Sequence, residues 1–228
     1  MILSLEKKFV ILNPPKTGTG FRERLIRRRS DLCWLGRYQP QGSWITDKMK
    51  KLVESKEIDL LEIGYRHLKL DEVHIFFDLL GLNLNDFFVC VFVRNPWDRM
   101  ISWYNMTYNQ KLKQAKTEAE KLEVSKRLLN PNVIERFISR DCLNNYIMVD
   151  NKVKVDYIGK LETHEKDMDF ICNRVKMSLK KKEWESKYNS HHKSISKHFN
   201  SKIINKISNT ESFVINQMGY KIEDSIYP

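Results

Sequence analysis

Two short apolar segments constrain the fold of this chain more than any other feature. They are KFVILN at residues 8–13 and FFVCVFV at residues 87–93, and both are rich in β-branched and aromatic residues. Uninterrupted apolar runs of this length are typical of strands that are covered on both faces. Each run leads through a loop into a segment with helical patterning. Because strands that alternate with helices form crossover units, the sequence predicts an α/β fold with three layers, a central parallel β-sheet flanked by helices.

Weaker patterns indicate the remaining elements. Further strands are expected at residues 33–37, 60–64 and 155–159, and helices at residues 21–29, 46–55, 70–80, 96–108, 111–127, 131–140, 162–177 and 201–218. The highly charged helix at residues 111–127 is interpreted either as a lid or as a solvent-exposed arm. A length of 228 residues suits one domain spanning residues 1–228.

Composition limits the class of protein and of partner. The 40 Lys and Arg residues against 29 Asp and Glu give a formal net charge of +11, which favours nucleic acid, a membrane surface or a small polyanion as partner. No apolar run approaches the roughly 18 residues of a membrane span, and from the pattern of the first residues we expect no secretion signal. The cysteines (Cys33, Cys90, Cys142 and Cys172) are scattered without a CxxC pair. This pattern predicts reduced thiols in a cytoplasmic protein without a metal.

The first apolar run leads into PPKTGTG, which we call the first loop (residues 14–20). Ligands of open α/β sheets bind at this end of the strands. Gly18 and Gly20 let the backbone approach an anion, and the first N–H groups of the next helix point toward it. Lys16 adds a positive charge, but it precedes both glycines, unlike the lysine of the ATP and GTP consensus. An ordinary strand-to-helix turn is the structural alternative.

The second apolar run leads into RNPWDRMIS, which we call the second motif (residues 94–102). Strand propensity does not explain Arg94, whose guanidinium could grip a phosphate with Ser102 as a further donor. The alternatives are a salt bridge for Arg94 and a solvated Ser102. The remaining signals are those of a helix start, an N-cap, a proline at the first position and an acid in the first turn (Asn95, Pro96 and Asp98). An apolar stripe on that helix is interpreted as core (Trp97, Ile101, Tyr104 and Tyr108).

Together the two motifs resemble those of sulfotransferases that use 3′-phosphoadenosine 5′-phosphosulfate (PAPS). The first loop looks like the 5′-phosphosulfate loop of that family, and the second motif, with Arg94 and Ser102 eight residues apart, looks like its 3′-phosphate motif. The segment VDYIGKLETHEKDMDFI at residues 155–171 and the closing MGY at residues 218–220 are similar to the carbohydrate-type and bacterial branch. The resemblance covers most of the chain, least of all residues 111–127, and implies the P-loop-like sulfotransferase fold.

The resemblance also implies roles for individual residues. Lys16 would contact the phosphosulfate and act in catalysis, the backbone of Thr17, Gly18, Thr19 and Gly20 would cradle the 5′-phosphate, and Arg94 and Ser102 would hold the 3′-phosphate. Many members carry a hydroxyl residue where this chain has Gly20, so that contact comes from Thr19, from a backbone N–H, or is missing. One lysine near the bridging oxygen can offset the charge on the leaving phosphate, so no metal is required.

The implied reaction is an in-line transfer of the sulfuryl group from PAPS to a hydroxyl, expected to belong to a saccharide, which leaves adenosine 3′,5′-bisphosphate (PAP). A base must take the hydroxyl proton, and histidine suits neutral pH. Of the six histidines, His67 follows a predicted strand and precedes a predicted helix, where several family members have a histidine. His74 and His164 are weaker candidates. We therefore expect His67 to be the catalytic base.

Two other classes of protein stay open at this point. A nucleic-acid-binding module would explain the net charge, although no known nucleic-acid motif is present. A small-molecule kinase with a degenerate loop is disfavoured because no GK[ST] follows the strand. The basic runs at residues 22–29 and 175–182 are interpreted as solvated faces, or as a field that attracts the donor or an anionic glycan. Lys193 and Ser194 are possible nucleotide contacts, and the acceptor and the oligomeric state cannot be read from the sequence.

Overall fold

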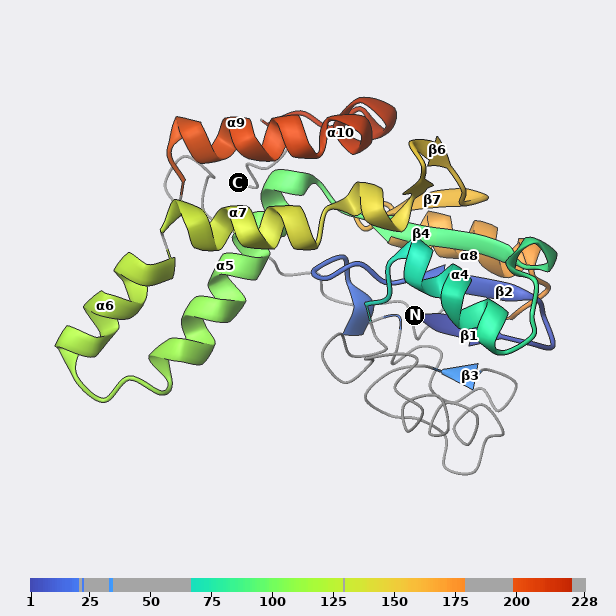
Figure 1. Cartoon of the computed structure of the whole chain (residues 1–228), viewed down its shortest axis with the longest axis horizontal. Coiled ribbons are helices and arrows are strands. Elements are labelled where there is room, and N and C mark those ends of the chain that lie inside the picture. The colour runs from blue at the N-terminus through green and yellow to red at the C-terminus, as the bar shows by residue number, and fades with distance from the viewer. Residues whose placement is uncertain (21, 23–32, 35–66, 129, 179–198, 223–228) are drawn as a thin grey trace. The chain divides into compact units, whose positions relative to one another are not determined.

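The computed structural model of the chain describes residues 1–20, 22, 33–34, 67–128, 130–178 and 199–222 (Figure 1). The chain forms two compact units, and each is described by itself. Unit 1 comprises Met1–Val93 and Asn145–Lys187, and unit 2 comprises Arg94–Asn144 and Tyr188–Pro228. The assignment of residues 1–228 to one domain stays a prediction.

Unit 1 is built on a five-stranded sheet in the order β3-β1-β2-β4-β7. The strands are β1 (Ile2–Ser4), β2 (Phe9–Leu12), β3 (Cys33–Trp34), β4 (Phe88–Val93) and β7 (Tyr157–Lys160). β2, β4 and β7 are parallel, with Leu12 opposite Val91 and Val93 opposite Lys160. β1 runs antiparallel to both of its neighbours. The predicted fold class is confirmed, and β1, which the sequence did not reveal, makes the sheet mixed.

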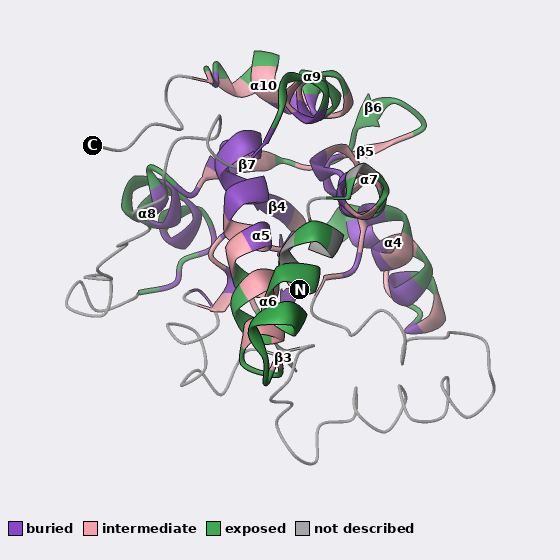
Figure 2. Cartoon of the chain, turned by 90° about the vertical axis from the view of Figure 1, so that its left-hand side faces the viewer, coloured by how far each residue is buried: buried purple, intermediate pink, exposed green. Residues whose placement is uncertain are grey.

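The two faces of the sheet are covered by different helices. Phe9, Ile11 and Phe92 belong to a buried cluster with Met168 and Ile171 of α8 (His164–Arg174). Helix α4 (Leu70–Leu79) lies on the other side of the sheet, as Figure 2 shows. The central strands are thus covered on both faces, which explains why their sequences are apolar throughout.

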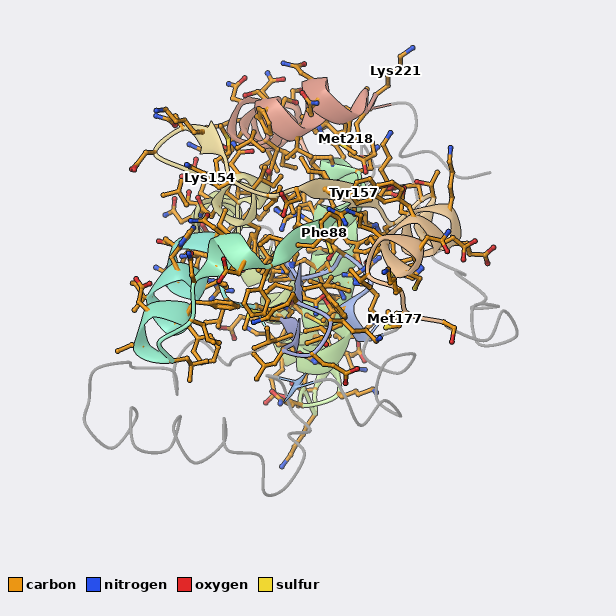
Figure 3. All side chains as sticks on the ribbon, turned by 90° about the vertical axis from the view of Figure 1, so that its right-hand side faces the viewer. Phe88, Lys154, Tyr157, Met177, Met218 and Lys221 are labelled. Carbon is orange, nitrogen blue, oxygen red and sulfur yellow. The ribbon has the colours of Figure 1, made fainter. Side chains whose placement is uncertain are left out.

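Close packing continues at the edge strand β7. A Cβ atom at Gly159 would lie 2.9 Å from the Phe92 ring, so this position requires glycine. Phe88 and Tyr157, both labelled in Figure 3, pack against the same cluster from the beginnings of β4 and β7. The remaining short elements of the chain include η1 (Leu84–Asp86), η2 (Leu143–Tyr146) and a hairpin of β5 (Met148–Val149) and β6 (Lys152–Val153).

Unit 2 is helical in its described part. Its helices are α5 (Pro96–Leu112), α6 (Glu118–Leu128), α7 (Pro131–Arg140), α9 (Ser201–Thr210) and α10 (Ser212–Met218). The first half of α5 is buried, whereas α6 is largely exposed (Figure 2). Local caps define the starts of α5, α7 and α9, because Asn95, Asn130 and Asn200 each accept a hydrogen bond from the first turn.

Two predicted helices are interrupted. The helix expected at residues 111–127 is wrong as a single element, since α5 runs on to Leu112 and α6 begins at Glu118. The helix expected at residues 201–218 is broken at Glu211, whose buried carboxylate accepts hydrogen bonds from Arg99 Nη2 at 2.6 Å and from the Leu143 backbone N–H at 3.0 Å. Burial raises the pKa of this carboxyl, and Arg99 opposes the shift.

The other expectations divide simply. The strands at residues 8–13, 87–93 and 155–159 and the helices expected at residues 70–80 and 131–140 are confirmed within one or two residues. The helix expected at residues 96–108 begins as predicted but continues to Leu112, and α8 covers the middle of the helix expected at residues 162–177. The elements expected at residues 46–55 and 60–64, and all of residues 21–29 except Arg22, lie outside the described residues.

Candidate active site

The first loop leaves the carboxyl end of β2 and turns into a helix at residues 19 and 20. Lys16 and Gly18 have positive φ angles, of 68° and 83°, so the loop contains a lysine in the left-handed region that glycine prefers. The hydroxyls of Thr17 and Thr19 both donate to the carbonyl oxygen of Pro14, at 2.8 and 3.3 Å. The loop is therefore closed by its own side chains.

This closure determines which groups the loop can offer to an anion. Thr17 and Thr19 are buried and donate inward, whereas Lys16, Gly18 and Gly20 are partly exposed. A phosphate has only acceptor oxygens at neutral pH, so the donors suited to it are backbone N–H groups and the Lys16 ammonium. The residues present fit the 5′ end of a nucleotide, with backbone donors in place of the hydroxyl that Gly20 lacks.

Arg22 lies directly beneath the first loop and is fully buried. Its guanidinium donates to the Thr17 carbonyl oxygen at 2.7 Å, to Thr17 Oγ1 at 3.1 Å and to Asn13 Oδ1 at 3.1 Å. Its Cζ atom lies 4.3 Å from the centre of the Phe92 ring. The interpretation of residue 22 as part of a solvated basic face is wrong. The burial depends on Phe92 and Asn13, which no local pattern around residue 22 reveals.

His67 is brought to the same end of β2 from a distant part of the chain. Its Nδ1 lies 2.6 Å from the carbonyl oxygen of Asn13, which is 54 residues earlier. The Tyr146 hydroxyl donates to the His67 carbonyl oxygen at 3.1 Å, so the residue is held on two sides. A carbonyl oxygen can only accept, so Nδ1 carries a hydrogen and the neutral ring has its lone pair on Nε2.

The second motif follows β4 and belongs to unit 2. Asn95 Oδ1 accepts hydrogen bonds from the backbone N–H groups of Trp97 and Asp98, at 3.1 and 3.4 Å, and Pro96 is the first residue of α5. Arg94 is buried, and its Nη2 lies 3.7 Å from Asp98 Oδ2. The salt bridge that was the alternative for Arg94 therefore exists, although it is long.

Ser102 is half-buried on α5, one turn beyond Asp98. Residues four apart on a helix are neighbours on one face. Arg94 thus extends along the face of α5 that also carries Ser102. Trp97, Ile101 and Tyr104 are buried as core, as predicted, and Tyr108 is half-buried.

The other histidines with predicted roles are placed differently. His164 is 6% exposed, its ring centre lies 5.0 Å from that of Phe92, and burial, with a smaller effect of Arg22, lowers its pKa to about 3. His164 is therefore a neutral core residue. His74 is half-buried on α4. Lys193 and Ser194 lie outside the described residues.

In the part of the chain that the structure describes, no helix is both long and apolar enough to cross a bilayer. Among the same residues, no group of three or more His, Cys, Asp or Glu side chains is arranged to hold a metal ion. Cys90, Cys142 and Cys172 carry buried thiols.

Comparison with known proteins identifies the family of the chain. A model of the sulfotransferase family matches residues 77–226, which is more than half of the chain. The chain belongs to the sulfotransferase family. The predicted family and enzyme class, a PAPS-dependent sulfotransferase, are thereby confirmed. The matched region of this sulfotransferase contains Arg94 and Ser102 and begins after Lys16 and His67.

A solved structure that resembles this sulfotransferase is that of mouse sulfotransferase SULT7A1 complexed with PAP. The sequence identity is 14% and the TM-score 0.47, and the alignment covers 94% of this chain and 86% of the mouse chain. No curated protein sequence matches the chain.

Proposed function

We propose that this sulfotransferase moves the sulfuryl group of PAPS to a hydroxyl of a saccharide, with His67 as the general base, and that residues 1–228 act as one domain. The observation that carries the assignment of the base is the hydrogen bond between His67 Nδ1 and the Asn13 carbonyl oxygen. It holds the ring beside the start of the first loop and leaves the lone pair of the neutral ring on Nε2, which is the atom that accepts a proton in this form.

The donor is bound by two groups of residues in this proposal. Lys16 and the backbone N–H groups of Thr17, Gly18, Thr19 and Gly20 bind the 5′-phosphosulfate. Arg94 and Ser102 bind the 3′-phosphate. The inward hydroxyl bonds of the first loop support a cradle made of backbone donors, and the course of Arg94 along the Ser102 face of α5 supports the second assignment.

In this proposal the residues of the chain accept a proton and stabilise negative charge. PAPS supplies the activated sulfuryl group: a new oxygen–sulfur bond forms at the acceptor, the bond from sulfur to the 5′-phosphate oxygen breaks, and PAP leaves. His67 Nε2 takes the proton of the attacking hydroxyl. Lys16 offsets the negative charge that grows on the leaving phosphate, which is the type of stabilisation that pre-positioned cations supply best.

The proposal of a saccharide acceptor is supported by sequence similarity to the carbohydrate-type branch at residues 155–171. In the structure this segment contains β7 and the first part of α8. Glu162, between them, is exposed and lies just beyond the carboxyl end of β7. A carboxylate at this position can accept hydrogen bonds from sugar hydroxyls.

The test is transfer of label from radiolabelled PAPS to a panel of glycans, lipids and small alcohols. We expect incorporation into a glycan by the wild-type protein, and a rate of incorporation about 10²- to 10³-fold lower for Lys16→Ala. Incorporation only into a lipid or an alcohol would overturn the saccharide assignment. Calorimetry with PAP, beside a salt series with DNA, separates donor binding from nucleic-acid binding, because only the latter loses affinity steeply with salt.

A further inference from the structure

We propose that Arg22 is a positioning residue that fixes both the donor-binding backbone of the first loop and the base His67. This inference rests on the proposed function of the first loop and of His67. Arg22 itself touches neither the donor nor the acceptor, since its side chain is fully buried beneath the loop.

Burial of a guanidinium is costly unless its N–H groups are hydrogen-bonded. Arg22 meets this requirement with acceptors that belong to the site: two atoms of Thr17 and one of Asn13. The Phe92 ring covers one face of the guanidinium, with Cζ 4.3 Å from the ring centre. The Phe92 ring of β4 therefore keeps the guanidinium in one orientation, and the guanidinium fixes the first loop through its bonds to Thr17.

The bond to the Thr17 carbonyl oxygen orients a donor for the anion. In a planar trans peptide the C=O and N–H groups point in opposite directions. Because Thr17 O is held toward Arg22 at 2.7 Å, the N–H of Gly18 in the same peptide points away from Arg22, toward the outer side of the loop. The positive φ of Gly18 maintains this orientation. Arg22 thus acts on donor binding through the backbone.

Asn13 connects the same arginine to the base. Its side-chain Oδ1 accepts from Arg22 Nε at 3.1 Å, and its backbone oxygen is the partner of His67 Nδ1 at 2.6 Å. Its Nδ2 group is buried and has no hydrogen-bond partner among the residues that the structure describes. Among the described residues, Arg22 is thus the hydrogen-bond partner that fixes the Asn13 side chain. By fixing Asn13, Arg22 also fixes the backbone carbonyl that selects the Nδ1–H form of His67.

Lysine cannot replace arginine here, because the three bonds require a planar fork of donors rather than one ammonium. The first variant is therefore Arg22→Lys. The matched control is Arg174→Lys, which makes the same change at an exposed arginine that also lies over a phenylalanine ring, with Cζ 5.5 Å from the centre of Phe88. Arg174 has no place in the proposed site.

The first measurement is calorimetry with PAP, which needs no acceptor. We expect Arg22→Lys to raise the Kd for PAP about tenfold or more, the effect of losing hydrogen bonds to a charged group. Arg174→Lys should stay within about twofold of the wild type, as surface changes do. Equal affinity for PAP in Arg22→Lys and in the wild type would overturn the assignment to the first loop.

The second measurement is nitrogen NMR of isotope-labelled histidine, with the signals of His67 identified by their loss in His67→Ala. The wild type should show the Nδ1–H tautomer, and Arg22→Lys a mixture of both tautomers. An unchanged tautomer in a folded Arg22→Lys would overturn the link to His67. If Arg22→Lys does not fold, Asn13→Leu takes its place, because it removes the side-chain contact with Arg22 and keeps the backbone carbonyl. We expect the same mixture of tautomers in this variant. An unchanged His67 tautomer in Asn13→Leu would overturn the link.

Failure of this inference differs from failure of the proposed function. If the wild type does not bind PAP, the donor site itself is wrong. If the wild type binds PAP and His67→Ala keeps full transfer, the base is wrong. If the wild type binds PAP and His67→Ala loses transfer, but Arg22→Lys has the same affinity for PAP and the same His67 tautomer as the wild type, only the role of Arg22 is wrong.

Discussion

The first loop and the second motif follow neighbouring parallel strands, yet they present different groups for an anion. In the first loop the hydroxyls of Thr17 and Thr19 close the turn from inside, and a buried Arg22 supports it, so the outward donors are mainly backbone. In the second motif the helix begins immediately after the Asn95 cap, and the charged group is the buried side chain of Arg94, whose Nη2 lies 3.7 Å from Asp98 Oδ2. We therefore expect the same strand–loop–helix pattern to bind one phosphate through backbone donors and the Lys16 ammonium, and the other through side-chain donors.

This difference predicts separate roles for the residues of the first loop and those of the second motif. Groups around the first loop, Lys16 and His67, should affect the chemical step, whereas Arg94 and Ser102 should affect mainly binding of the 3′-phosphate. Substitutions can break or sharpen this comparison.

The largest effect is expected from His67→Ala. Loss of a general base should lower turnover by about 10²- to 10⁴-fold. Affinity for PAP should stay within about twofold, because His67 holds no phosphate in this account. Steady-state transfer and calorimetry measure the two quantities, with His74→Ala as the control on α4. Wild-type turnover in His67→Ala would make the base assignment wrong.

Lys16→Ala should come next. Removing one group that stabilises developing charge lowers turnover by about 10²- to 10³-fold. Affinity for PAP should also fall, because the proposal places the Lys16 ammonium at the 5′-phosphate in the ground state. The control is Lys152→Ala, at an exposed lysine of β6. A variant that loses affinity while keeping its turnover at saturating PAPS would restrict Lys16 to binding.

Arg94→Ala should show the opposite signature. We expect the Kd for PAP to rise about 10- to 100-fold, the loss of a charge-assisted hydrogen bond, while the Kd for adenosine 5′-phosphate, which lacks the 3′-phosphate, changes little. Arg140→Ala is a matched control, since Arg140 is paired with Asp141 at 2.7 Å but is exposed. Equal losses for both nucleotides would remove Arg94 from the 3′-phosphate.

The smallest effect is expected from Thr19→Ala. Its hydroxyl donates to Pro14 at 3.3 Å, so its removal should cost about 1 kcal/mol of stability and change the Kd for PAP less than about threefold. Thermal unfolding and calorimetry measure these changes. A loss of affinity as large as that of Arg94→Ala would mean that the Thr19 hydroxyl also contacts the nucleotide.

The sequence predicted the elements whose signals are local. The central strands have continuous apolar runs. The helices α5, α7 and α9 begin directly after Asn95, Asn130 and Asn200, whose side chains cap the first turn. The strand β1 has only three residues, too few for a periodic pattern. The break at Glu211 has no glycine or proline and depends on Arg99 and Leu143, which are distant in the sequence.

The same distinction holds for the candidate site. Lys16, Arg94 and Ser102 belong to motifs that are contiguous in the sequence, so they could be proposed from spacing. The contact of His67 with Asn13 joins residues 54 positions apart, and the burial of Arg22 requires Phe92 from another strand. A run of arginines predicts a solvent-exposed face, and only the folded structure shows that one of them is buried against a distant residue.

The most direct test of this account is a crystal structure of the protein with PAP. We predict that the 5′-phosphate accepts hydrogen bonds from Lys16 and from backbone N–H groups of the first loop, and that the 3′-phosphate of the same molecule is bound by Arg94 and Ser102. A complex in which PAP leaves either Lys16 or Arg94 without a phosphate contact would contradict it.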